Sequence, residues 1–192
     1  MGRGTRAWLM AVGALAVVVA LVAVLGGWAP STAQAARDQQ PGVAMKVPGW
    51  TITVHRAEVV NHDGADDDYP DEKSEVRLFL DLTSTDEESE SFFPGGLVQV
   101  QLPDGTPLPD GYAEQTAPWS GSWDPDVTFP SAIDTELPGL ALDAPAPSSV
   151  VVVVHDRVPA RGFLRTPGEL SNGPARWRLE LPTPDLRRPV EE

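Results

Sequence analysis

The sequence of 192 residues contains no cysteine and only three histidines. The lack of cysteine excludes disulfide bonds and lipid attachment through a cysteine. His55, His62 and His155 do not form a His-Glu-x-x-His pattern or another spacing typical of metal ligands. His155-Asp156 is a histidine beside an acid, but no Gly-x-Ser-x-Gly sequence supplies a serine nucleophile. We therefore predict that the protein is not an enzyme and that it needs no cofactor.

Basic residues are also scarce, because 14 lysines and arginines stand against 28 acidic residues. Residues 37–192 hold all the acidic residues and 12 of the basic ones, a net charge of 12 − 28 = −16. A surface this acidic repels nucleic acid and anionic lipid and favours cations and basic partners. It also keeps an exported protein soluble. We therefore expect no nucleic-acid partner.

One long apolar run is present, from Ala7 to Leu25, and it precedes a polar region. At ~1.5 Å per residue, a helix of this length crosses the hydrocarbon core of a bilayer. Trp8 and Trp28 lie ~30 Å apart along such a helix, at the positions of the two interfacial aromatic belts. We predict that residues 1–36 are a transmembrane anchor that contacts the membrane through residues 7–29.

The same region can also be read as a cleavable signal peptide, with small residues at Ala33-Gln34-Ala35 before Ala36. The protein would then be secreted. The length of the apolar run and the tryptophan spacing favour the anchor. Under both interpretations Arg3 and Arg6 stay in the cytoplasm and the C-terminal part lies outside the membrane, following the positive-inside rule.

The exported part reads as a series of short strands. Its 20 prolines are about twice the average usage and argue against long helices. Alternating apolar and polar residues predict strands at 50–54, 76–82, 98–102 and 177–181, and Leu140 and Leu142 suggest a short one. Five valines at 150–154 predict a strand that is buried on both faces. The apolar phase slips after Val54, which predicts a β-bulge near His55 and Arg56. Asp104-Gly105 predicts a hairpin turn with positive φ angles.

These elements predict an all-β fold, an antiparallel β-sandwich of immunoglobulin type, preceded by one N-terminal apolar helix. We expect the sandwich to span residues 47–181. Residues 37–46 are predicted to be a polar linker, and residues 182–192 a loose, proline-rich and charged tail.

The order of the motifs also resembles a known family. Arg77-Leu-Phe-Leu-Asp-Leu-Thr83 is followed by Leu97-Val-Gln-Val-Gln-Leu-Pro-Asp-Gly105, then by Leu137-Pro-Gly-Leu140 and the valine strand. This arrangement, over roughly residues 47–156, is similar to uncharacterised Ig-like extracellular domains of exported Gram-positive proteins, relatives of the secreted mycobacterial immunoprotective antigen. The chain lacks the lipobox cysteine of the lipoprotein members. The resemblance implies an Ig-like fold and no catalytic residues.

Two features are candidate binding sites. Trp119 and Trp123 stand in a polar loop, where exposed indoles stack on sugars or anchor a protein partner. The alternative is that both indoles fold back over the edge of the core. The second feature is an acidic loop whose oxygen ligands suit Ca²⁺, although the EF-hand order is absent and a plain solvated loop is the alternative. Its acidic residues are Asp63, Asp66, Asp67, Asp68, Asp71 and Glu72.

Together these features predict a membrane-anchored, extracytoplasmic Ig-like binding or accessory module that is not catalytic. Its expected partners are the membrane and an extracellular protein or cell-wall glycan. The alternative is a secreted cell-wall protein that binds or hydrolyses carbohydrate.

Overall fold

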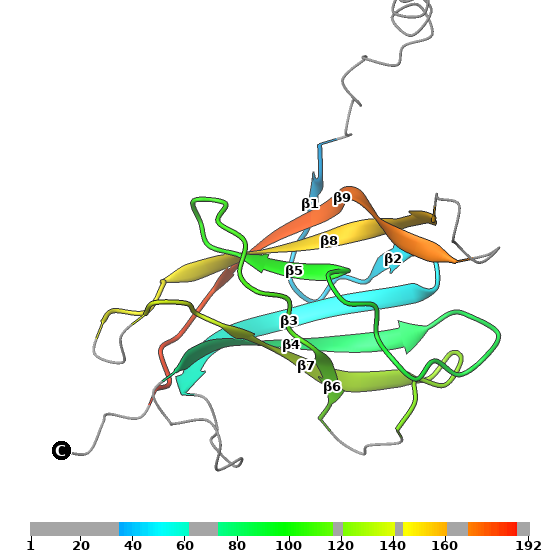
Figure 1. Ribbon diagram of the computed structural model, residues 1–192, viewed down its shortest axis with the longest axis horizontal. Coiled ribbons are helices and arrows are strands. Elements are labelled where there is room, and N and C mark those ends of the chain that lie inside the picture. The colour runs from blue at the N-terminus through cyan, green and yellow to red at the C-terminus, as the bar shows by residue number, and fades with distance from the viewer. Residues whose placement is uncertain (1–34, 62–72, 117–120, 141–143, 161–168, 188–192) are drawn as a thin grey trace, which may run out of the picture. The chain divides into compact units, whose positions relative to one another are not determined.

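Two β-sheets packed face to face form the described part of the protein, which is a computed structural model (Figure 1). The structure describes residues 35–61, 73–116, 121–140, 144–160 and 169–187. The four-stranded sheet has the order β1-β9-β8-β5, and the five-stranded sheet has the order β2-β3-β4-β7-β6. The strands are β1 (Arg37–Asp38), β2 (Met45–Val47), β3 (Trp50–Asn61), β4 (Ser74–Ser84), β5 (Val98–Gln101), β6 (Ala113–Gln115), β7 (Thr128–Glu136), β8 (Ser149–Pro159) and β9 (Leu170–Pro182).

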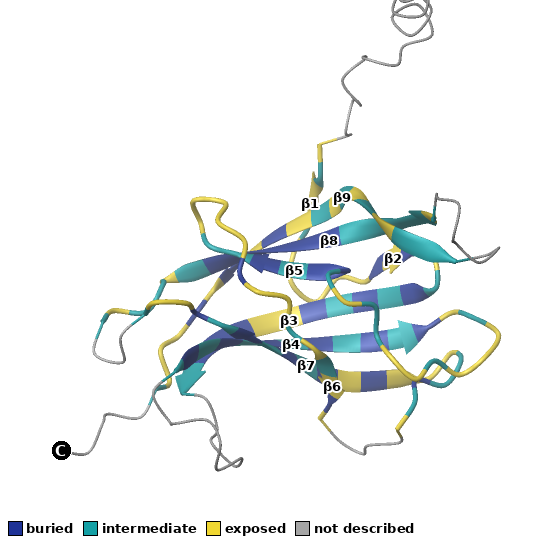
Figure 2. Ribbon diagram, in the orientation of Figure 1, coloured by how far each residue is buried: buried dark blue, intermediate teal, exposed yellow. Residues whose placement is uncertain are grey.

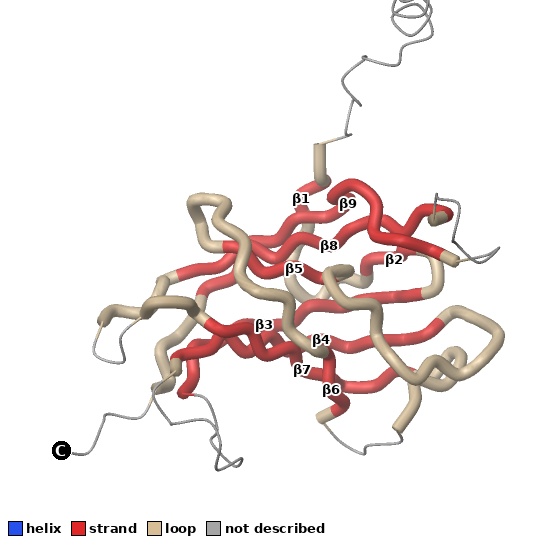
Figure 3. Tube along the Cα trace, viewed as in Figure 1, coloured by secondary structure: helices blue, strands red, loops and turns tan. Residues whose placement is uncertain are grey.

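The described residues contain strands and loops but no helix (Figure 3). The predicted all-β sandwich is confirmed at this level. Within the described ranges, no helix has the length and apolar character needed to cross a membrane. The apolar run predicted as an anchor lies in residues 1–34, outside the described residues.

The core lies between the sheets and is built by alternation along the strands (Figure 2). In β4, Val76, Leu78, Leu80 and Leu82 are at most 1% exposed, and the residues between them face outward. This is the pattern that a period of two gives when one face of a sheet is buried. The predicted strands at 50–54, 76–82, 98–102, 150–154 and 177–181 all coincide with strands of the structure, although 98–102 ends one residue earlier.

The predicted bulge in β3 is confirmed. Val54 pairs with Leu80, but the next pair of the ladder joins Arg56 to Phe79. His55 is therefore an extra residue, and the inward face changes phase so that Ala57 and Val59 are buried.

The valine strand is buried on both faces, as predicted. Val150, Val152 and Val154 point into the core. Val151 and Val153 point to the outer face, yet they are only 2% and 6% exposed. Their register partners are Gln101 and Glu180 for Val151, and Gln99 and Arg178 for Val153. Long polar side chains on both neighbouring strands shield the outer valines with their aliphatic stems.

Three predicted segments need correction. The predicted linker 37–46 contains β1, which pairs in parallel with β9, and the start of β2, whose Met45 is fully buried. The short strand expected at Leu140 is a turn, while Leu142 lies outside the described residues. A strand instead forms at β7. Its buried positions alternate between apolar Phe129 and Ile133 and polar Ser131 and Thr135, and this mixture hides the period.

The third correction concerns the tail, of which residues 183–187 are described. The tail leaves β9 and crosses to the edge of β3, where Val59 donates to the carbonyl of Pro184 and accepts from the amide of Leu186. Thr183 is 5% exposed. The tail covers an open strand edge with backbone hydrogen bonds, which need no apolar pattern in the sequence.

The predicted hairpin turn is present at residues 102–106. The amide of Gly105 donates to the carbonyl of Leu102 at 2.9 Å, and Gly105 has a φ of 88°. Asp104 does not have a positive φ, contrary to the prediction. Its carboxylate instead accepts a hydrogen bond from the Thr106 amide at 2.8 Å, which lowers the pKa of Asp104. This arrangement matches a three-residue hairpin loop with glycine at the left-handed position.

Candidate binding loops

Trp123 is a core residue rather than an exposed binding residue. It is 6% exposed and packs edge-on against Trp50, with ring centroids 6.0 Å apart. Phe93 packs against the other side of this cluster, 5.0 Å from Trp50. The Trp123 indole therefore has no free face for a ligand, and its position fits the alternative that it folds over the core. Trp119 lies outside the described residues.

The six acidic residues of the predicted Ca²⁺ loop also lie outside the described residues. The structure describes only the base of that loop, where Asn61 pairs with Ser74 in the β3–β4 hairpin. In the described ranges, no group of three or more histidine, aspartate or glutamate side chains is placed to hold a metal ion. The Ca²⁺ site stays a prediction.

Three loops meet beside the aromatic cluster. Glu90 in the β4–β5 loop and Trp123 in the β6–β7 loop exchange two backbone hydrogen bonds, of 3.0 and 2.8 Å. The Ser89 hydroxyl donates to the Asp124 carboxylate at 2.7 Å, which ties the same two loops together. The β5–β6 loop joins them near Gly96, where an added Cβ would lie 3.3 Å from Asp110. We call residues 85–97, 108–112 and 121–127 the loop junction.

The loop junction exposes large apolar side chains. Phe92 is 82% exposed, Tyr112 86% and Val127 45%. Phe92 is adjacent to Phe93, so one phenyl ring faces solvent while its neighbour packs on the core. Single exposed apolar residues are normal on a protein surface. Three of them on loops that meet at this junction are a candidate binding surface.

The chain packs closely on β7 at Gly111, the residue before the exposed Tyr112. A Cβ at Gly111 would overlap the carbonyl oxygen of Asp134 and lie 2.7 Å from a methyl group of Ile133. The backbone at Gly111 therefore passes directly over β7, where only glycine leaves enough space. This contact keeps the backbone next to Tyr112 close to β7.

The sequence analysis did not identify Phe92 or Tyr112. Both stand outside any alternating segment, and each has glycine or proline within two residues. An aromatic residue in a loop without periodicity is the available signal, but it does not distinguish Phe92 from the inward-facing Phe93.

The electrostatics of the loop junction are strongly acidic. Residues 78–156 contain no lysine or arginine, so no basic side chain belongs to these loops. Their acidic residues are Asp86, Glu87, Glu88, Glu90, Asp110, Asp124 and Asp126. Exposed aromatic rings within an acidic surface are complementary to a partner that combines apolar and basic groups.

Both described histidines, His55 and His155, interact with neighbouring groups of the fold. His155 Nδ1 lies 3.0 Å from the carbonyl oxygen of Gly173, and Asp156 pairs with Arg176 at 2.9 Å rather than with the histidine. His55 Nε2 lies 2.9 Å from Asp81 on the outer face of the five-stranded sheet. His155-Asp156 therefore does not form the acid–histidine pair that orients a catalytic base.

Paired charges cover the outer face of the five-stranded sheet. Arg77 forms a two-pronged ion pair with Asp134, with both N–O distances at 2.8 Å. This hydrogen bonding raises the pKa of Arg77. Arg56 lies 3.7 Å above the ring of Phe79 and also pairs with Glu58. These pairs lie next to one another across β3, β4 and β7, so this face presents matched charges.

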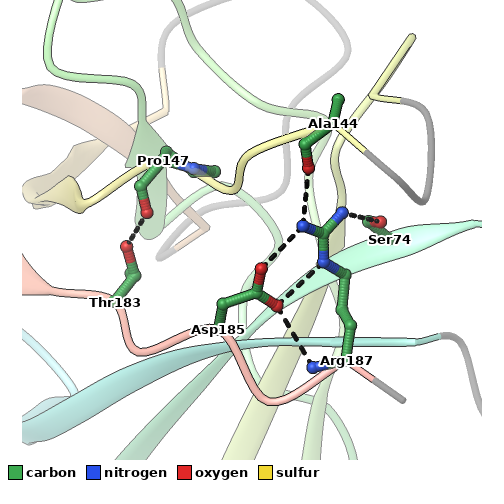
Figure 4. A network of polar contacts seen from close by, with 6 residues as sticks. All are labelled: Ser74, Ala144, Pro147, Thr183, Asp185 and Arg187. Atoms are coloured by element: carbon green, nitrogen blue, oxygen red, sulfur yellow. Dashed lines mark hydrogen bonds and ion pairs between the residues drawn. The ribbon is translucent and has the colours of Figure 1, made fainter. Parts of the chain in front are cut away.

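A buried guanidinium closes the end of the sandwich at which β4 begins (Figure 4). The Arg187 side chain is 7% exposed and donates to both carboxylate oxygens of Asp185, at 2.8 and 2.7 Å. It also donates to the Ala144 carbonyl at 2.7 Å and to the Ser74 hydroxyl at 3.2 Å. The pKa of Asp185 is lowered, chiefly by the hydrogen bond from Arg187. We call Ser74, Ala144, Asp185 and Arg187 the C-terminal clamp.

Comparisons with known proteins give little further information. No protein-family model matches the chain, and no curated protein matches it. Among solved structures, the chain is similar to an uncharacterized beta-sandwich protein from Clostridium difficile 630. The two share 12% identity with a TM-score of 0.42, and the match covers 78% of this chain and 96% of the other.

Proposed function

We propose that the protein is a membrane-anchored, extracytoplasmic Ig-like binding module that is not an enzyme. The observation that carries the binding role is the exposure of Phe92 and Tyr112, at 82% and 86%, on two loops that come together near Gly96. Loops that are ordered before binding lose less conformational entropy when a partner associates. The partner would contact the loop junction through apolar and basic groups.

The strand order supports the Ig-like assignment. An immunoglobulin sandwich has strands A, B, E and D in one sheet and C, F and G in the other. If β3, β4 and β5 are taken as A, B and C, the order β3-β4-β7-β6 corresponds to A-B-E-D. The order β5-β8-β9 corresponds to C-F-G. β1 and β2 are then additions before strand A.

The membrane anchor rests on the sequence of residues 7–29. Its test is a carbonate wash of membranes from cells that make the full chain. We expect the protein in the membrane fraction with Met1 retained. A soluble form that begins at Ala36 would instead support the secreted alternative.

The binding role is tested by site-specific photo-crosslinking in the same cells. A photoreactive phenylalanine analogue replaces Phe92 or Tyr112, and the exposed hairpin residue Asp104 is the control position. We expect adducts of the same mass from positions 92 and 112 and none from position 104. The absence of an adduct at both aromatic positions would contradict the proposal.

The nature of the partner is tested with purified peptidoglycan. Retention of the full chain on peptidoglycan, lost in Phe92→Ala and Tyr112→Ala, would identify a glycan partner. Release of sugar fragments in the same assay would favour the hydrolytic alternative over a binding module.

A further inference from the structure

Charge is unevenly distributed along this acidic chain. Residues 78–156 contain 14 acidic residues and no basic residue, whereas residues 157–188 contain seven arginines and three acidic residues. The arginine-rich segment includes β9, which lies at the side of the four-stranded sheet where β1 is added. The edge formed by β1 and β9 is therefore less acidic than the net charge of −16 suggests.

Two arginines lie near one tryptophan at the β1–β9 edge, and a third follows that tryptophan in β9. Parallel pairing sets Arg37 opposite Trp177 and Asp38 opposite Arg178. The guanidinium carbons of Arg37 and Arg176 each lie 5.7 Å from the centre of the Trp177 ring. We call Arg37, Arg176, Trp177 and Arg178 the arginine edge.

The charges of the arginine edge are accessible. All three arginines are exposed, and Trp177 is half-buried. Arg178 and Asp38 are 3.9 Å apart, and the Asp38 side chain is 90% exposed, so their interaction is weak. Arg176 pairs with Asp156, but this pair is also partly open to solvent. A guanidinium that lies near an indole ring keeps N–H donors for phosphate oxygens.

The predicted anchor limits how far this edge can lie from the membrane. Twelve residues, 26–37, follow the apolar run and include Arg37. Fully extended, they span at most ~40 Å, at 3.3–3.6 Å per residue. Arginine is suited to the headgroup region, because its guanidinium pairs with phosphate.

We propose that the arginine edge docks on the anionic phospholipid surface of the membrane that holds the anchor. This inference rests on the membrane anchor of the proposed function. Docking at β1 and β9 directs β6 and β7 away from the lipid, because they lie on the opposite side of the sandwich (Figure 1). The acidic loops next to β6 and β7 are thereby kept from the anionic surface.

The test uses the full chain in vesicles of phosphatidylcholine alone, or with 30% phosphatidylglycerol, each containing a headgroup-linked quencher. Because the chain has no cysteine, a fluorophore is attached at Gln40→Cys, beside β1, or at Glu114→Cys in β6 as the far-side control. We expect strong quenching at position 40 only in the anionic vesicles, and little at position 114 in both. Quenching at position 40 should fall at 1 M salt, where the Debye length is ~3 Å.

The matched variants remove the same number of charges from two places. Arg37→Gln, Arg176→Gln and Arg178→Gln together should lower the ratio of docked to undocked protein about 100-fold, since each arginine near an anionic surface contributes about fivefold. Lys46→Gln and Arg56→Gln on the other sheet, together with Lys73→Gln just before β4, should leave quenching unchanged. Thermal melting of both triple variants checks that each is folded.

Three outcomes would overturn the docking proposal. They are equal quenching in neutral and anionic vesicles, equal loss in both triple variants, or a response at position 40 to soluble polyphosphate without any response to anionic vesicles. Flotation with neutral vesicles reports the anchor separately. A chain that floats but shows no anionic quenching therefore contradicts only the docking, whereas a chain that does not float contradicts the anchor.

Discussion

The two ends of β4 are closed by opposite kinds of chemistry. At Ser74, the C-terminal clamp uses one buried guanidinium to join the tail, the β7–β8 loop and the start of β4. At Ser84, the loop junction begins, and there aromatic rings close the core while other aromatic rings remain in solvent. The buried guanidinium of the clamp is hydrogen-bonded within the protein. The loop junction leaves the apolar side chains of Phe92 and Tyr112 exposed to solvent.

This difference separates structural from binding roles. Hydrogen-bonded polar groups that are shielded from water contribute to the stability of one conformation. Exposed aromatic rings contribute little to folding, because they keep their contact with water in the folded state. We therefore expect the clamp and the buried aromatic cluster to control stability, and Phe92 and Tyr112 to control association.

The largest expected effect is in the buried aromatic cluster. Trp123→Ala removes a large side chain that packs on Trp50, and it should reduce the free energy of unfolding by ~3–5 kcal/mol. Chemical denaturation of the full chain measures this loss. Trp123→Phe, which keeps an aromatic ring, is the control and should lose less. A loss below ~1 kcal/mol for Trp123→Ala would contradict its place in the core.

Alternation allowed the sequence to predict the long strands. In β4, apolar residues occupy every second position from Val76 to Leu82. In the valine strand, they occupy every position from 150 to 154. Both patterns are therefore visible in the sequence. It is not visible in β7, where Ser131 and Thr135 occupy buried positions. Their burial depends on the strands that flank β7, and a single sequence does not contain this information.

Short segments stabilised by backbone hydrogen bonds were missed for a related reason. β1 and the tail at residues 183–187 pair through main-chain groups, which every residue except proline can supply as donor and acceptor. Composition therefore suggested a linker and a loose tail. The candidate site was missed at Phe92 because two adjacent phenylalanines give no sign of which one faces the core.

The next effect is at the C-terminal clamp. Arg187→Gln leaves the Asp185 carboxylate and the Ala144 carbonyl without their charged donor, and should cost ~1–3 kcal/mol of stability. Arg188→Gln removes the same charge one residue later and is the matched control. Equal melting temperatures for the two variants would show that the buried ion pair does not stabilise the tail.

The clamp also predicts a dependence on pH. Because the pKa of Asp185 is lowered in the folded protein below its ordinary value, its contribution is complete above the unfolded pKa. It is lost as pH falls through the lowered pKa. Stability measured from pH 6 to pH 2 should therefore fall less steeply in Arg187→Gln than in the unmodified chain. Identical slopes would contradict the linkage.

The smallest effect is expected at Phe92, which can be compared directly with its neighbour Phe93. Phe92 is 82% exposed, whereas Phe93 contacts Trp50. Phe92→Ala should change the free energy of unfolding by no more than ~0.5 kcal/mol, as surface substitutions usually do. Phe93→Ala, which alters the same loop by the same atoms, should cost several times more. Denaturation of both variants measures the difference. If Phe92→Ala is as destabilising as Phe93→Ala, the Phe92 ring supports the fold, and the binding role loses one of its two aromatic contacts.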